Sequence, residues 1–192
     1  MTQTNSLSVL FVCMGNICRS PKAHGVFRQK VIDHGLASQV AVDSAGTHNH
    51  HPDSPPDEQS QAHAAKRAIT GPCSQTSDHR PMQPNERSQA HAAKPAYDLS
   101  DLRARQIQDE DFQRYDLILV IDWDNLAFMQ DACPPKYRAK VRRLTKFCSR
   151  YDSPVVPDPY YSGSHGFDHV LDLVEDACEG LNKHIRQEFA ST

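Results

Sequence analysis

Val9-Leu10-Phe11-Val12-Cys13-Met14-Gly15-Asn16-Ile17-Cys18-Arg19-Ser20-Pro21 is the stretch of sequence that decides the fold. It begins with a run of apolar, partly β-branched residues, which is typical of a buried strand. After Ser-Pro, apolar residues recur every three to four positions, as in an amphipathic helix, at Ala23, Val26, Phe27 and Val31. The residues between the two are therefore predicted to form a loop that joins the end of a strand to the start of a helix.

This loop has the chemistry of a site for a phosphate group. Backbone N–H groups converge at a helix N-terminus, which also carries partial positive charge. Arg19 supplies a planar fork that matches two phosphate oxygens. Cys13 lies in electropositive surroundings of the kind that favour a thiolate nucleophile. Gly15 and Asn16 tolerate the positive φ angles that a ring of inward-pointing amides requires.

Strands and helices alternate along the rest of the chain. Short strands are predicted at 40–44, 116–121 and 140–144, and helices after Asp122 and over 166–185. Alternation of this kind indicates a parallel sheet that is covered by helices on both faces. In such a sheet the active site lies at the carboxyl ends of the strands. Cys13, Ser44 and Asp122 all come at strand ends, so we expect them to face one crevice.

Composition narrows the class of protein. The chain has 192 residues, 38% of them apolar, which suits one domain with a full core. A net charge of −3 without a block of Lys or Arg argues against nucleic acid or an anionic membrane as the partner. The first apolar run ends at Met14 and no Lys or Arg precedes Arg19, so neither a signal peptide nor a membrane span is predicted. The six cysteines are then expected to be reduced thiols in the cytoplasm.

The middle of the chain contains a duplication. Residues 60–66, Ser-Gln-Ala-His-Ala-Ala-Lys, recur unchanged at 88–94. Both copies are rich in helix formers, and each follows a possible N-cap, Asp57 or Asn85. Only one helix is expected here, and the sequence does not say which copy forms it. The other copy, approximately 61–88, is predicted to be an insertion of a polar helix and a loop that buries little and is mobile.

A second chemical motif, Val156-Pro157-Asp158-Pro159-Tyr160-Tyr161, lies far downstream. Its two prolines stiffen the loop around Asp158. An isolated Asp-Pro is most often a simple turn, and paired tyrosines are most often surface residues. Together with a nucleophilic cysteine, however, the carboxyl group can protonate a leaving oxygen, and flat tyrosine rings can pack against a phenyl group.

Cys-Met-Gly-Asn-Ile-Cys-Arg-Ser-Pro resembles the signature loop of the low-molecular-weight protein tyrosine phosphatases, and Val-Pro-Asp-Pro-Tyr-Tyr resembles their general-acid loop. The resemblance covers nearly the whole chain apart from the 28 duplicated residues. It implies a single α/β domain over 1–192, with a flavodoxin-like, four-stranded parallel sheet in the order 2-1-3-4. It also implies an enzyme that needs neither a cofactor nor a metal.

The resemblance assigns a role to each matching residue. Cys13 becomes the nucleophile, Arg19 the phosphate clamp and Asp158 the general acid. Ser20 would donate a hydrogen bond to the thiolate, Asn16 and Ser44 would hold the loop in shape, and Asp122 would be a supporting acid. The phosphate-binding loop comprises Met14, Gly15, Asn16, Ile17, Cys18, Arg19 and Ser20. The walls of the substrate pocket are assigned to His50, Tyr160 and Tyr161.

Two positions depart from the family pattern. His50 stands where the family usually has Trp or Tyr on the pocket wall, which leaves the substrate preference open. Leu102 stands where some relatives have a histidine that partners the supporting acid.

His48, His50 and His51 are dense enough to suggest a metal site, but a solvated loop is the preferred interpretation. Cys18 is either a small core residue or a thiol that resolves an oxidised Cys13.

Three functions from different classes are compatible with these residues. The first is hydrolysis of phosphotyrosine through a phosphocysteine, with a phosphoprotein as substrate, a tyrosine kinase among the candidates, and a monomeric enzyme. The second is a thioredoxin-coupled arsenate reductase of the same fold, which needs two further cysteines close together, whereas Cys133 and Cys148 are far apart in the sequence. The third is a phosphate-binding module without turnover, for which loss of Cys13, Arg19 or Asp158 would be expected. The first function is the prediction.

Overall fold

Four strands form one sheet in the order β2-β1-β3-β4, and every neighbouring pair is parallel. They are β1 (Leu7–Cys13), β2 (Val40–Gly46), β3 (Leu117–Val120) and β4 (Val141–Arg143). This computed structural model describes residues 6–70, 97–161 and 166–191. The strand order and direction confirm the predicted fold class.

Both faces of the two central strands are buried, which explains why these strands read as continuous apolar runs. Successive residues of a strand point to opposite faces of the sheet. On one face, Val9, Phe11 and Leu119 pack against apolar residues of α1 (Arg19–Asp33) and α6 (Gly166–Ala190). On the other face, Val12 and Ile118 belong to a separate cluster with residues of α4 (Asp111–Arg114) and α5 (Trp123–Ala132).

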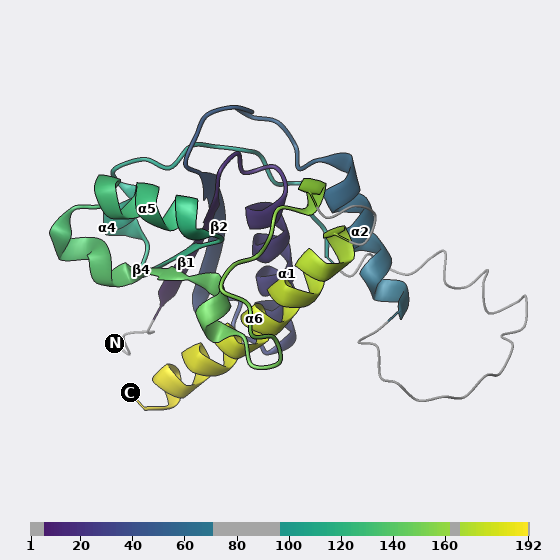
Figure 1. Cartoon of the computed structure of the whole chain (residues 1–192). Helices are drawn as coiled ribbons and strands as arrows, with labels where there is room; N and C mark the ends of the chain where they lie inside the picture. The colour runs from purple at the N-terminus through teal and green to yellow at the C-terminus, as the bar shows by residue number, and fades with distance from the viewer. Residues whose placement is uncertain (1–5, 71–96, 162–165, 192) are drawn as a thin grey trace, which may run out of the picture.

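The helices lie in two layers with the sheet between them. Figure 1 shows α1 and α6 on one side of the sheet and α4 and α5 on the other. The helices that the sequence predicts after Asp122 and from Gly166 are confirmed as α5 and α6. Three short 3₁₀ helices complete the connections: η1 (Pro135–Lys140), η2 (Leu144–Phe147) and η3 (Pro159–Tyr161). Over the described ranges, no helix has a stretch long and apolar enough to cross a bilayer.

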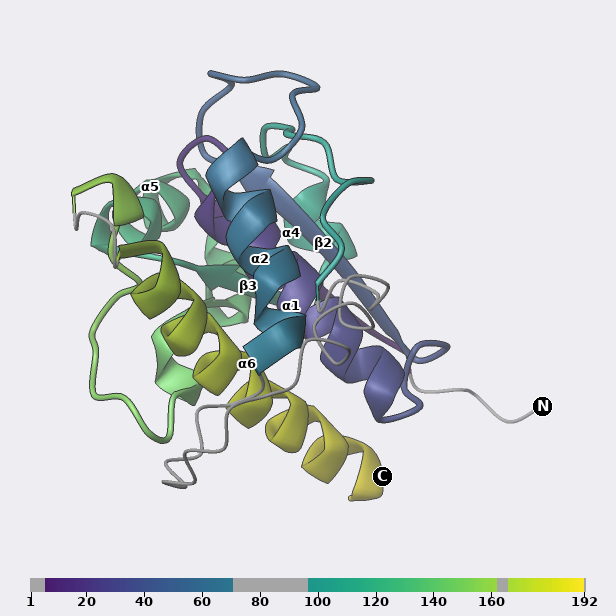
Figure 2. The ribbon, with the colours of Figure 1, turned by 90° about the vertical axis from the view of Figure 1, so that its right-hand side faces the viewer.

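The first copy of the repeat forms α2 (Glu58–Thr70), which lies beside α6 in both views (Figures 1 and 2). Asp57 caps it, because a carboxylate oxygen of Asp57 accepts a hydrogen bond of 2.9 Å from the backbone N–H of Ser60. Ser60 and Ala64 are fully buried. Arg67 pairs with Asp172 and Glu175 of α6, at 2.9 Å from Glu175. This copy is therefore anchored to the domain.

The second copy, 88–94, and most of the predicted insertion over 61–88 lie outside the described residues. The structure shows, however, that residues 61–70 of that range belong to α2. Both Arg67 and Tyr97 contact Glu175, through hydrogen bonds of 3.1 Å and 2.9 Å. Described residues on either side of the undescribed segment therefore contact the same carboxylate, so a short connection can join them.

Two deletions of 28 residues would restore a single repeat and differ in one residue. Removal of 61–88 leaves Pro95 after the repeat, whereas removal of 68–95 leaves Arg67 there. We expect the second variant to have the higher Tm, because proline in a helix costs about 3 kcal/mol and the first variant also loses the pairs of Arg67. Thermal unfolding followed by circular dichroism measures the difference. Equal Tm values would show that Arg67 does not anchor α2, and two insoluble variants would show that the segment is required for folding.

Candidate active site

The predicted phosphate loop connects β1 to α1, as the sequence indicates. Cys13 is the last residue of β1 and is 3% exposed, and Arg19 is the first residue of α1. Gly46, at the end of β2, lies directly against this loop. A Cβ atom at Gly46 would lie 2.6 Å from the carbonyl oxygen of Met14, so no larger residue fits without moving the loop. The loop is therefore held closely against the neighbouring strand.

A chain of hydrogen bonds connects the Cys13 sulfur to Asn16. The Cys13 Sγ lies 3.0 Å from Ser20 Oγ, and Asn16 Nδ2 donates to the same oxygen at 2.9 Å. Since Asn16 uses an acceptor position of the hydroxyl, the Ser20 proton can point to Cys13 or to the Ala45 carbonyl at 3.3 Å. Asn16 has a positive φ of 55°, as expected, whereas Gly15 does not adopt the left-handed conformation. This geometry suits a serine that donates to a thiolate.

Arg19 brings the two chemical motifs together. Its Nη1 lies 2.6 Å from Asp122 and donates to the Val156 carbonyl at 3.2 Å. Its Nη2 lies 3.8 Å from Asp158. Burial alone would lower the pKa of Arg19, but the charges of Cys13, Asp122 and Asp158 outweigh it and raise that pKa. The guanidinium is thus a fixed cation between the cysteine loop and the loop that carries Asp158.

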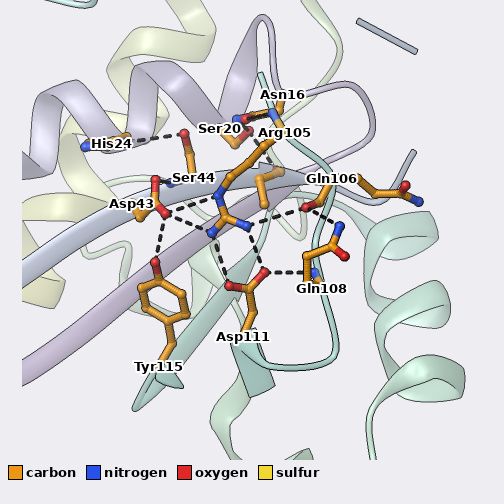
Figure 3. A network of polar contacts seen from close by, with 11 residues as sticks. Asn16, Ser20, His24, Asp43, Ser44, Arg105, Gln106, Gln108, Asp111 and Tyr115 are labelled. Carbon is orange, nitrogen blue, oxygen red and sulfur yellow. Dashed lines mark hydrogen bonds and ion pairs between the residues drawn. The ribbon is translucent and has the colours of Figure 1, made fainter. Parts of the chain in front are cut away.

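Asp122 has a second contact that fixes its position. It is the N-cap of α5, and its Oδ1 accepts a hydrogen bond of 2.8 Å from the Asn125 N–H. Ser44 is the other predicted supporting residue, and its loop-holding role stays a prediction. Its hydroxyl lies 3.3 Å from His24 Nδ1 on α1 (Figure 3). Burial lowers the pKa of His24 to about 4, so the imidazole is neutral at pH 7.

Several residues of the predicted loop and pocket wall have exposed side chains. Met14 is 45% exposed and Tyr160 is 56% exposed. The His50 ring stacks on His48 with 5.2 Å between ring centroids. Tyr161 is the last residue of η3, but its side chain lies outside the described residues. In the described part of the chain, no group of three His, Cys, Asp or Glu residues is arranged to hold a metal ion.

Cys18, the last loop residue before α1, is buried and is protonated at neutral pH. Burial raises the pKa of its thiol to about 11, although Lys22 opposes that shift. Lys22 is fully buried, with its Nζ 3.7 Å from the Cys18 sulfur, and burial lowers its pKa. The geometry gives Cys18 a place in the core and leaves its redox role a prediction.

Three residues contact the loop in ways that the sequence analysis missed. The His51 ring lies over Gly15, with its Cδ2 3.3 Å from the position of a Gly15 Cβ. The Asp57 N–H donates to the Ile17 carbonyl at 2.8 Å, which ties the start of α2 to the loop. The Arg105 N–H donates to Asn16 Oδ1 at 3.1 Å. No local pattern in the sequence indicates these contacts, because each joins the loop to a segment far along the chain.

Figure 3 shows how the Arg105 segment is held. The Arg105 guanidinium lies 2.8 Å from Asp43 of β2 and 2.8 Å from Asp111 of α4. Tyr115 also donates to Asp43, at 2.8 Å. Burial by itself would raise the pKa of Asp43, but Tyr115 and Arg105 lower it. Two carboxylates on different elements thus fix the residue whose backbone N–H holds Asn16.

We expect Arg105→Met to weaken catalysis because it disturbs the conformation of the phosphate loop. Without its ion pairs, the Arg105 backbone no longer holds Asn16 in place, and Ser20 is positioned less well against Cys13. The loss of one such hydrogen bond, about 1–1.5 kcal/mol, predicts a fall in kcat/KM of roughly tenfold. The rate of Cys13 alkylation by iodoacetamide should also shift to higher pH, because the thiolate is stabilised less.

Arg28→Met is the matched control. Arg28 has a similarly exposed side chain, 29% against 32%, and it also pairs with a carboxylate, Asp101, at 2.7 Å. It does not touch the phosphate loop through any hydrogen bond in the described structure. Both variants should lower Tm, but only Arg105→Met should move the alkylation profile, and Arg105→Lys should recover part of it. Equal profiles for both methionine variants would contradict the positioning role.

A buried cysteine in an anion-binding loop, a clamped arginine and a nearby carboxyl group define the class of cysteine-dependent phosphatases. The model of the family "Low molecular weight phosphotyrosine protein phosphatase" matches residues 8–83 and 73–191. Because the two segments overlap, residues 73–83 are matched twice, in the region of the duplication. The chain belongs to this family.

Individual relatives agree with the family match. A low molecular weight protein-tyrosine-phosphatase of Streptomyces coelicolor is 37% identical over 187 residues, 94% of each chain. The human low molecular weight phosphotyrosine protein phosphatase is 31% identical over 183 residues, 94% of this chain and 97% of the human one. A crystal structure of a protein tyrosine phosphatase from Entamoeba histolytica superposes with a TM-score of 0.77 at 32% identity, covering 97% of this chain and all of that one.

Proposed function

We propose that this chain hydrolyses phosphotyrosine in proteins through a phosphocysteine formed on Cys13. The observation that carries the proposal is the position of Arg19. Its guanidinium lies 3.8 Å from Asp158. Arg19 is also the first residue of α1, the helix that follows the loop after Cys13. A phosphoryl group bound by Arg19 and the loop amides would therefore have the nucleophile on one side and Asp158 on the other.

The first chemical step uses both side chains. The Cys13 thiolate attacks phosphorus and forms an S–P bond, while the bond to the tyrosyl oxygen breaks. That oxygen is a poor leaving group unless it is protonated, and the neutral Asp158 carboxyl group donates the proton. Arg19 and the loop N–H groups bind the phosphoryl oxygens in the transition state.

The second step regenerates the enzyme. The Asp158 carboxylate accepts a proton from water, which attacks the phosphorus of phosphocysteine. The S–P bond breaks, inorganic phosphate leaves, and Cys13 returns as a thiolate. The Ser20 hydroxyl, 3.0 Å from the sulfur, is placed to stabilise that leaving thiolate by a hydrogen bond.

The wider setting of the reaction is also part of the proposal. The substrate is a phosphotyrosine-containing protein, and a tyrosine kinase is one candidate. The enzyme would act as a monomer in the cytoplasm. Family membership supports a phosphoprotein substrate.

The test traps the covalent intermediate. Wild-type enzyme is mixed with a phosphotyrosine peptide, quenched in acid, and analysed by peptide-level mass spectrometry. We expect the mass of one phosphoryl group on the peptide that contains Cys13, together with release of phosphate. Turnover of the peptide without any phosphoryl group on Cys13 would refute the mechanism, and arsenate reduction with thioredoxin in place of turnover would favour the reductase.

A further inference from the structure

A cleft of about 570 Å³ lies beside the loop that carries Asp158, between α2, η3 and the start of α6. We call it the α2 groove. The α2 side of the groove is lined by Gln59, Ala62, His63 and Lys66. The other side includes two aromatic residues, Tyr160 of η3 and Phe167 of α6. The volume is within the range of protein sites that bind ligands. The chemical steps proposed above use none of these residues, and Tyr160 is assigned only to the pocket wall.

The α2 side of the groove is one exposed helix face. Gln59, Ala62, His63 and Lys66 follow the spacing of three and four residues that places side chains in one row. Gln59, Ala62 and Lys66 are exposed and His63 is half-buried. The row is about 10 Å long, the length of roughly three residues of an extended chain. A short peptide segment therefore fits along it.

The opposite wall is rigid. The His63 ring stacks on Phe167 with 5.3 Å between centroids, and Lys22 Nζ lies 4.3 Å from the Phe167 centroid. Tyr160 meets Phe167 edge-on at 5.5 Å. Asp168, the residue after Phe167, pairs with His63 at 2.8 Å. These contacts hold the aromatic wall in place and leave Lys66 as the exposed cation of the row.

The groove is continuous with the active site. The Tyr160 N–H donates to Asp158 at 3.1 Å, and Tyr160 is assigned to the wall of the phosphotyrosine pocket. At the other side, Asp57 ties the start of α2 to Ile17 of the phosphate loop. Figure 2 shows α2 running away from the phosphate loop along α6. A substrate chain that leaves the pocket past Tyr160 enters this groove.

We propose that the α2 groove binds the residues of the substrate protein that flank phosphotyrosine, and that it selects an apolar side chain followed by an acidic one. The apolar side chain would pack on Tyr160 and Ala62, and the acidic one would pair with Lys66. This inference rests on the proposed phosphotyrosine phosphatase function. It gives the first copy of the duplication a part in substrate selection.

The test compares two phosphotyrosine peptides that differ in their flank. One carries leucine and two aspartates, and the other carries glycine and serines, with each flank placed once before and once after phosphotyrosine. Binding is measured by fluorescence anisotropy on the Cys13→Ser protein, and kcat/KM on the wild type. We expect the first flank to lower Kd by about tenfold on one side, the size expected from one apolar contact and one surface ion pair.

Variants separate the groove from the catalytic site. Lys66→Glu and Ala62→Phe should each remove most of the preference and leave p-nitrophenyl phosphate hydrolysis within about twofold. Lys183→Glu, the same change at an exposed position of α6, is the matched control and should keep the preference. Equal Kd values for both flanks on both sides, or equal losses with Lys183→Glu, would overturn the proposal. Absence of turnover by the wild type would count against the enzyme function, whereas the Kd comparison would still decide the groove.

Discussion

Replacement of Cys13 by serine is expected to reduce turnover by roughly 10⁴–10⁶-fold, the scale of loss when a covalent nucleophile is removed. A serine hydroxyl stays protonated at neutral pH and is a far weaker nucleophile than a thiolate. The oxygen can keep the hydrogen bond to Ser20, which lies 3.0 Å from the sulfur. Arg19 and the loop amides are unchanged, so inorganic phosphate should still bind. Steady-state hydrolysis of p-nitrophenyl phosphate and calorimetric titration with phosphate measure the two effects.

Cys18→Ser is the matched control for this substitution. It makes the same chemical change five residues later in the same loop, at a buried thiol. Because burial raises the pKa of Cys18 to about 11, that thiol is not the nucleophile at neutral pH. Its kcat should stay within a few-fold of the wild type. Substantial activity of Cys13→Ser, or an equal loss with Cys18→Ser, would contradict a covalent mechanism on Cys13.

The main elements of the fold could be predicted from local patterns. The ends of two strands, near Cys13 and Asp122, are predicted by apolar runs that stop at residues typical of loops or helix caps. Parallel strands place their carboxyl ends at one edge, and Arg19 does contact Asp122 there, at 2.6 Å. The juxtaposition of Arg19 and Asp158 required the family resemblance in addition, because 139 positions separate them and no local rule measures that distance.

The contacts that were missed depend on tertiary packing. The contact of the Ser44 hydroxyl with His24 could not be predicted, because it depends on the way α1 packs on β2. His50 was assigned to the pocket and His51 was not, because the loop conformation that places His51 over Gly15 produces no periodic pattern in the sequence. The choice between the two repeats was also hidden. The copies are identical over seven residues, and the residue that follows, Arg67 or Pro95, is the first to distinguish them.

Asp158→Ala is the second substitution with a large expected effect. We expect kcat for phenyl phosphates to fall by roughly 10²–10⁴-fold, the usual contribution of a positioned general acid. Asp158 is half-exposed and lies 3.8 Å from Arg19, whereas Asp122 lies 2.6 Å from the same guanidinium. Asp122 therefore supplies the close ion pair that fixes Arg19, and we propose Asp158 as the group that transfers the proton.

The dependence on the leaving group distinguishes an acid from a structural residue. A protonated leaving oxygen matters most when the phenol is a weak acid, so the loss in Asp158→Ala should be large for phenyl phosphate and small for p-nitrophenyl phosphate. Plots of log kcat against the pKa of the phenol should be steeper for the variant than for the wild type. Asp152→Ala, an exposed aspartate six residues earlier on the same connection, is the matched control and should leave the slope unchanged. A uniform loss across all leaving groups would mean that Asp158 only maintains the loop, and the proton would then have to come from another group.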